Sequence, residues 1–147
     1  MVSRWGITPR QSVQAEAARV GADAVVDQCV ALLAGRHVEP AFLRTLAGPA
    51  AEGVIAGYAG GIDGYWPRVV ALRGLLHVWS PAATPSVLRA FADEAWRVRE
   101  MASKVVAAHR IDEALEALAP LTHDPVPRVR AAASRARMRL TQPAPHP

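Results

Sequence analysis

Apolar residues recur at helical spacing along most of the chain. The clearest run is Val98, Met101, Ala102, Val105 and Val106, which follows the i, i+3, i+4, i+7, i+8 pattern of a helix with one buried face. The same spacing predicts further helices in the second half, over 67–79, 85–91, 111–121 and 127–140. The pattern therefore predicts an all-α protein.

Capping residues divide the first part of the chain into three more helices. Thr8 precedes a proline, a good start for a helix over 9–20, because threonine can accept free N–H groups and proline lacks one. A second helix is predicted over 22–34, where Gly35 provides a left-handed stop. Pro40 begins the third. Three predicted helices therefore precede the glycine-rich middle of the chain.

The segment 48–64 holds six of the ten glycines. Gly53, Gly57 and Gly61 are four residues apart, so on a helix they would lie on one face and let another backbone approach closely. The segment is short and flanked by charge, which favours packing inside a bundle over a membrane dimer. A phosphate loop is disfavoured because no Gly-Lys-Ser/Thr follows. We expect Gly60-Gly61 to end the helix.

A short phrase occurs three times at nearly even spacing: Pro67-Arg68-Val69, Trp96-Arg97-Val98 and Pro127-Arg128-Val129. Internal periods of roughly 20–50 residues indicate stacked units that bury their apolar faces against one another. We therefore expect one helical-repeat domain over 1–141, with clear repeats over 63–140, N-terminal helical pairs over 8–62 and a mobile proline-rich tail over 142–147.

The second-half units share an aspartate followed six residues later by an arginine. Asp93 is followed by Val98-Arg99, and Asp124 by Val129-Arg130. This arrangement resembles the HEAT repeat, in the short form found in many bacterial proteins. The resemblance implies an α-solenoid of stacked antiparallel helix pairs. A third unit, around Asp63, departs from it because valine stands at the arginine position.

The aspartate and arginine positions have a physical reason of their own. A carboxylate at a helix start can accept unsatisfied N–H groups and complement the positive end of the helix dipole. The arginine lies about one and a half turns further and can reach an aspartate of its own or an adjacent repeat. We therefore expect a structural ladder made of Asp93, Arg99, Asp124 and Arg130.

Further basic and aromatic residues lie off the apolar stripes. Aligning the repeated phrase makes Arg68, Arg97 and Arg128 equivalent, and likewise Lys104 and Arg135. In a stacked array they would form a basic row that could bind an acidic surface. The alternative is a solvated face on which Glu100 pairs with Arg97 and Lys104. Trp66 and Trp96 lie beside this row, where tryptophan either packs between repeats or contacts a partner.

Charge and cysteine content narrow the choice of partner and compartment. The formal net charge is +4, and five arginines follow the last acid, Asp124, which could attract an acidic protein, nucleic acid or an anionic membrane. Cys29 is the only cysteine, so an intramolecular disulfide is impossible and a reducing, cytoplasmic setting is expected. No apolar run has the length of a signal peptide or a membrane span.

Catalytic motifs are lacking: the histidines show no HExxH pairing and no Gly-x-Ser-x-Gly occurs. We therefore expect a non-enzymatic interaction or scaffold module that has a protein partner and needs no cofactor or metal. The alternative is nucleic-acid binding, since some HEAT-like DNA glycosylases for alkylated bases line a basic groove with similar residue types. Those types are present here as Trp66, Trp96, Asp93, Arg97 and Arg128.

Overall fold

The computed structural model describes residues 7–57 and 64–143, and within them the chain is helical without any strand. This confirms the all-α prediction. The α-helices are α1 (Pro9–Val20), α2 (Ala22–Leu33), α3 (Pro40–Ala47), α4 (Ala51–Ile55), α5 (Trp66–His77), α6 (Thr84–Ala90), α7 (Trp96–His109), α8 (Leu115–Leu118) and α9 (Pro127–Thr141). Short 3-10 turns are found at Gly48–Ala50, Pro81–Ala83, Asp112–Ala114 and Pro120–His123.

The first helices begin and end as their capping residues predict. The Thr8 hydroxyl accepts the backbone N–H of Gln11 at 3.1 Å, and the Gln11 side chain accepts the backbone N–H of Thr8 at 2.9 Å. This reciprocal capping box satisfies two otherwise free donors at the start of α1. Just after the C-terminal end of α2, Gly35 has a positive φ of 81°, as expected for a glycine that stops a helix.

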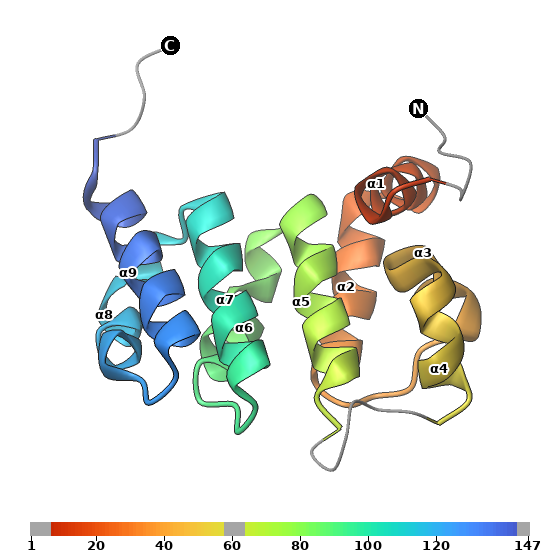
Figure 1. The fold of residues 1–147 in the computed structure, drawn as a ribbon. Helices are drawn as coiled ribbons and strands as arrows, with labels where there is room; N and C mark the ends of the chain where they lie inside the picture. The colour runs from red at the N-terminus through yellow and green to blue at the C-terminus, as the bar shows by residue number, and fades with distance from the viewer. Residues whose placement is uncertain (1–6, 58–63, 144–147) are drawn as a thin grey trace.

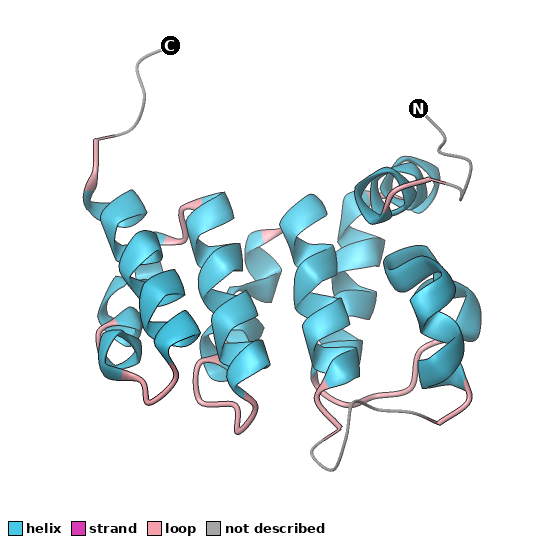
Figure 2. Cartoon of the chain, in the orientation of Figure 1, coloured by secondary structure: helices cyan, strands magenta, loops and turns pink. Residues whose placement is uncertain are grey.

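Helices α5, α7 and α9 lie side by side, with α6 and α8 behind them (Figure 1). α7 packs against both α5 and α9, and the other side of α5 packs against α2. Short loops join successive helices in this region (Figure 2). At the N-terminal end, α1 contacts α2, α3 and α5. The long helices α5, α7 and α9 therefore form one layer of the molecule.

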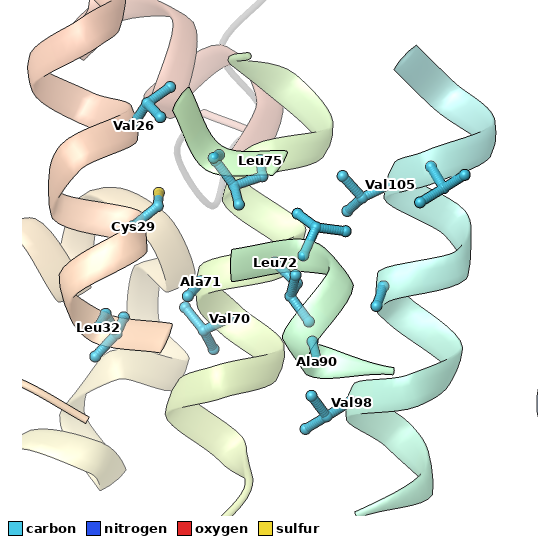
Figure 3. Packing of buried hydrophobic residues seen from close by; sticks show 14 of the residues in the cluster. Val26, Cys29, Leu32, Val70, Ala71, Leu72, Leu75, Ala90, Val98 and Val105 are labelled. Carbon is cyan, nitrogen blue, oxygen red and sulfur yellow. The ribbon is translucent and has the colours of Figure 1, made fainter. Parts of the chain in front are cut away.

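Buried apolar side chains from α2, α5, α6 and α7 pack together in the core (Figure 3). Helical spacing predicts an apolar stripe of Val69, Leu72, Leu76 and Trp79 for the helix over 67–79, but of these only Leu72 is fully buried. Because α5 packs against α2 on one side and α7 on the other, it buries a wider arc than a one-sided stripe. The buried residues of α5 are Val70, Ala71, Leu72, Gly74 and Leu75.

The glycine-rich segment does not pack as predicted. α4 ends at Ile55, and Gly53 and Gly57 are both exposed, so neither allows a close helix contact. Gly61, and the predicted helix end at Gly60-Gly61, lie outside the described residues, as do the last residues of the proline-rich tail.

The close approach occurs instead at Gly74 of α5. A Cβ atom there would lie 2.8 Å from Leu46 Cδ2 and 3.0 Å from Cys29 Sγ. Gly74 therefore lets α5 pack tightly against α2 and α3.

Over 7–57 and 64–143, no helix combines the length and the apolar character that crossing a bilayer requires.

Candidate interaction surface

Two largely buried arginine–aspartate pairs lie within residues 64–143, and each connects a long helix to the turn before the next long helix. Arg68 donates from Nε to Asp93 Oδ2 at 2.7 Å and from Nη2 to Asp93 Oδ1 at 3.1 Å. Arg99 makes the same two-pronged contact with Asp124, at 2.8 Å and 3.1 Å. Both pairs join residues 25 positions apart. We call each pair a rung; the geometry is the planar fork that makes arginine a strong carboxylate partner.

The rungs change the alignment of the repeats. Arg68 and Arg99 perform the same task, so the equivalent arginines are Arg68, Arg99 and Arg130, which are evenly spaced along the chain. We call their common spacing the repeat period. The alignment that makes Arg68, Arg97 and Arg128 equivalent is therefore wrong, because the residue equivalent to Arg97 is Trp66, two positions before Arg68. Arg68 binds Asp93 and is not free to face a partner. It occupies the arginine position of the first unit, where the alignment of the phrase places a valine.

The third arginine of this series keeps part of the pattern. Arg130 Nη1 donates to the main-chain oxygen of Asp124 at 2.7 Å, as Arg99 Nη1 donates to that of Asp93 at 2.8 Å. Each arginine therefore holds the turn that precedes its own helix, and Arg99 also binds the turn of the next unit.

The aspartates close turns and do not cap helices. The Asp93 carboxylate accepts the N–H of Ala95, and the Asp124 carboxylate accepts the N–H of Val126, both at 2.9 Å. These residues precede α7 and α9, whose first turns have no side-chain cap. The helix-cap prediction is therefore wrong, and the contact is the local aspartate turn that positions the carboxylate for its arginine.

Asp124 is only 6% exposed. Burial acts to raise its pKa, but the hydrogen bonds from Arg99 and from the Val126 N–H, with the charges of Arg99 and Arg130, outweigh burial. The pKa of Asp124 consequently lies below its usual value, and the carboxyl is ionised at neutral pH.

The corrected spacing defines two rows across the layer of α5, α7 and α9. One row is Trp66, Arg97 and Arg128, and the other is Arg73, Lys104 and Arg135, with one repeat period between neighbours in each. We call these six residues, together with Tyr65 and Trp96, the basic-aromatic face. Arg73 was missed by sequence reasoning, although it lies one repeat period before Lys104.

Cation–π contacts link the helices at this face. The Arg97 guanidinium carbon lies 4.6 Å from the Trp96 ring centroid and 5.8 Å from that of Tyr65. Arg128, on α9, lies 5.1 Å from the same Trp96 ring. On α5, Arg73 lies 5.3 Å from the Trp66 ring. Both tryptophans also pack against the core, so each ring is part of the packing and part of the face.

Glu100 lies beneath this surface and is only 6% exposed. It accepts two hydrogen bonds from Arg128, at 2.9 Å and 3.1 Å, and its carboxylate lies 4.0 Å from Lys104 Nζ. The predicted pairing with Lys104 is therefore present, whereas the described contacts of Arg97 are with aromatic rings. Glu100 thus holds Arg128 in place from below.

The charge of the layer is almost all positive. Arginine and lysine number two on α5, three on α7 and five on α9, whereas Glu100 is the only acid on the three helices. Arg73 adds an unsatisfied donor: no hydrogen-bond partner for its buried Nε is found among the described residues. Burial also lowers the pKa of Arg73. The face therefore has cations in excess of the carboxylates available to neutralise them.

The side chains of Cys29 and His109 are part of the packing of the helices. Burial raises the pKa of the Cys29 thiol to about 12, so it stays protonated and packs as a small apolar group. His109 Nε2 lies 2.6 Å from the Leu75 main-chain oxygen, and its ring stacks on Trp79 at 4.8 Å. These contacts tie α7 to α5.

Comparison with known proteins gives no relative: no protein-family model, no curated protein and no solved structure matches the chain.

Proposed function

We propose that this protein is a HEAT-like helical-repeat module, an α-solenoid of stacked helix pairs, that binds an acidic protein through its basic-aromatic face. The observation that carries the proposal is the alignment of five cations in two rows across three adjacent helices, with one buried acid among them. Stacked repeats offer extended surfaces of this kind for partners. Arginine and tryptophan are also the residues most enriched in interaction hot spots.

The repeat assignment is supported by the rungs. Two arginines separated by one repeat period each bind an aspartate 25 positions further on, and a third keeps the same main-chain contact at the same interval. Repetition of side-chain contacts, and not only of helices, is what a stack of equivalent units produces. The HEAT-like assignment therefore has support beyond the sequence pattern that suggested it.

The spacing of the cations favours a helical acidic partner. Arg97 and Lys104 on α7, like Arg128 and Arg135 on α9, are separated by two helical turns, or about 10 Å. Neighbouring packed helices lie about 8–10 Å apart. Carboxylates two turns apart on a partner helix have the same spacing.

The face is also partly preorganised. Aromatic rings hold Arg97, and Glu100 holds Arg128, so ordering these two long side chains costs little on binding. Arg135 is exposed and forms no ion pair with the residues described, 7–57 and 64–143. Arg97 and Arg135 are consequently the cations we expect to contribute most to recognition.

Nucleic-acid binding is the second candidate, since phosphate would also be attracted to this face. The structure gives less support to a DNA glycosylase. Asp93, the acid that a glycosylase of this kind would use, is bound by Arg68 and by the backbone of its own turn. The other acid near the face, Glu100, is buried beneath Arg128. Neither carboxylate is available to a substrate on the face, so we propose a binding module without catalysis.

The experiment compares two charge-reversed proteins with the natural one. Arg97→Glu with Arg135→Glu changes the face, and Arg36→Glu with Arg89→Glu makes the same change in charge at exposed residues elsewhere. All three are used for affinity capture from native extract, followed by quantitative mass spectrometry. We expect a specific acidic protein to be recovered with the natural protein and the control but lost with the face variant.

Equal recovery by all three proteins would remove the face as the interface. A parallel binding assay with duplex DNA at about 50 mM salt decides between the candidates. Retention that falls steeply with added salt and disappears in the face variant would favour nucleic acid, because phosphate neutralisation releases counterions.

A further inference from the structure

The outer side of α9 is exposed where the equivalent side of α7 is covered. Glu100, Ser103 and Val106 of α7 are buried, with α9 packed against their helix. The residues one repeat period later are Ala131, Ser134 and Arg137, and all three are exposed. Met138 beside them is 59% exposed. We call this surface, completed by Arg130, the end face: Arg130, Ala131, Ser134, Arg137 and Met138.

Arg130 is held as Arg99 is held, but its carboxylate is missing. Arg99 Nη1 donates to the main-chain oxygens of Asp93 and Glu94 at 2.8 Å and 3.1 Å. Arg130 Nη1 donates to those of Asp124 and Pro125 at 2.7 Å and 3.2 Å. The other two donors of Arg99, Nε and Nη2, bind the Asp124 carboxylate. In Arg130 the same two donors have no carboxylate among residues 7–57 and 64–143.

We propose that the end face docks a helix pair of a partner protein, and that this pair presents a carboxylate to Arg130 in the way that Asp124 is presented to Arg99. The partner carboxylate is fixed by an aspartate turn ahead of a helix, and small Ala131 and Ser134 let that helix approach closely. Arg137 adds a second positive charge where α7 has Val106, so an acidic partner helix fits. This interface is separate from the basic-aromatic face.

A second copy of the same surface is not the occupant. Two end faces brought together would place Arg130 and Arg137 of each copy against like charges, which costs free energy. The two aspartates known to sit in the required turn, Asp93 and Asp124, already bind Arg68 and Arg99. We therefore assign the missing carboxylate to a partner of a different sequence.

The first test supplies a defined unit to the end face. A second copy of residues 111–141, one repeat period in length, is joined directly after Thr141 of the full chain. The copy of Asp124 then lies 25 positions after Arg130, which is the separation found in both rungs. We expect one cooperative thermal transition, about 5 °C or more above that of the original chain. Arg130→Ala should lower the melting temperature more in the extended chain than in the original.

Two controls make this result decisive. Replacing the copied aspartate by asparagine should remove the added sensitivity to Arg130→Ala. Arg135→Ala, on α9 but outside the end face, should act equally in both chain lengths. A separate, lower melting transition for the added unit would overturn the proposal, as would an equal effect of Arg130→Ala in both lengths.

The second test looks for the partner in native extract. A photoreactive phenylalanine derivative replaces Ser134, or Glu113 as the control, and cross-linked peptides are sequenced. We expect cross-links at Ser134 to a peptide with an acidic residue ahead of a helix, absent from the control and lost with Arg130→Glu. No cross-link, a link between copies of this chain, or a peptide without such an acid would overturn the proposal.

Discussion

The repeat region, 64–143, and the N-terminal region, 7–57, use ion pairs of the same length in different ways. Arg99 and Asp124 are joined at 2.8 Å with side chains 15% and 5% exposed, whereas Arg44 and Glu52 are joined at 2.7 Å with side chains 53% and 60% exposed. A buried pair is costly to break because one charge is left without a partner, while water replaces either member of an exposed pair. Burial, and not distance, decides which pair stabilises its region.

The two regions share the apolar core. α2 packs against α5, and Gly74 brings α5 close to Leu46 and Cys29. The difference between the regions therefore concerns polar contacts between turns, not hydrophobic packing.

Truncating the shared core should have the largest effect, and a similar one in both regions. Leu72 on α5 and Leu46 on α3 are 0% and 2% exposed. Leu72→Ala and Leu46→Ala should each lower the free energy of unfolding by about 2–5 kcal/mol, through lost burial and the cavity left behind. Urea titration followed by circular dichroism measures the loss.

The same titration shows whether the regions unfold together. In a Trp5→Phe background, the remaining tryptophans, Trp66, Trp79 and Trp96, report fluorescence from the repeat region alone, and circular dichroism reports all helices. We expect coincident midpoints from the two signals. Separate midpoints would show that the shared core does not couple the regions.

Breaking a rung of the repeat region should have the next largest effect. Asp124→Ala leaves the largely buried Arg99 without its carboxylate and frees the Val126 N–H, at a cost of about 3 kcal/mol. Chemical denaturation provides the value. A loss below about 0.5 kcal/mol would show that the rung is as replaceable as a surface pair.

The rung should also make the repeat region sensitive to acid. Because the pKa of Asp124 is lowered in the folded protein, its contribution is complete above the unfolded value of about 3.9 and is lost as pH falls through the lower folded value. Unfolding midpoints measured between pH 6 and about pH 2.5 should fall less steeply for Asp124→Asn than for the natural protein. Parallel curves would contradict the assignment.

Removing the exposed pair of the N-terminal region should have the smallest effect. Glu52→Ala deletes the partner of Arg44, and the Arg44 side chain is then solvated without rearrangement. We expect no measurable change in the urea midpoint at physiological salt. A loss equal to that of Asp124→Ala would remove the contrast between the regions.

Much of the fold can be predicted from local sequence. Thr8 with proline, Gly35 and the Val98–Val106 spacing predict helices that the structure confirms, because caps and one-sided apolar stripes are local properties. The two-sided burial of α5 and the close contact at Gly74 depend on which helices pack together, and the sequence does not state that.

The surface was harder to predict than the helices. Arg68 and Arg97 each precede a valine, so the sequence alone makes them look equivalent. The contact of Arg68 with Asp93 shows instead that Arg68 is equivalent to Arg99. The same error of two residues hid Arg73. Counting one repeat period back from both Arg99 and Lys104 would have found the two positions, since the last two units keep that spacing throughout.

The central claim is that Arg68 and Arg99 hold neighbouring units together through their rungs, whereas Arg97 and Arg135 remain available for a partner. Arg99→Gln and Arg135→Gln remove the same charge from neighbouring helices, so their free energies of unfolding in urea test the claim most directly. We predict a loss of about 2–4 kcal/mol for Arg99→Gln, which leaves Asp124 buried and unpaired. We predict a change within about 0.5 kcal/mol for Arg135→Gln. Equal losses, or a larger loss for Arg135→Gln, would contradict it.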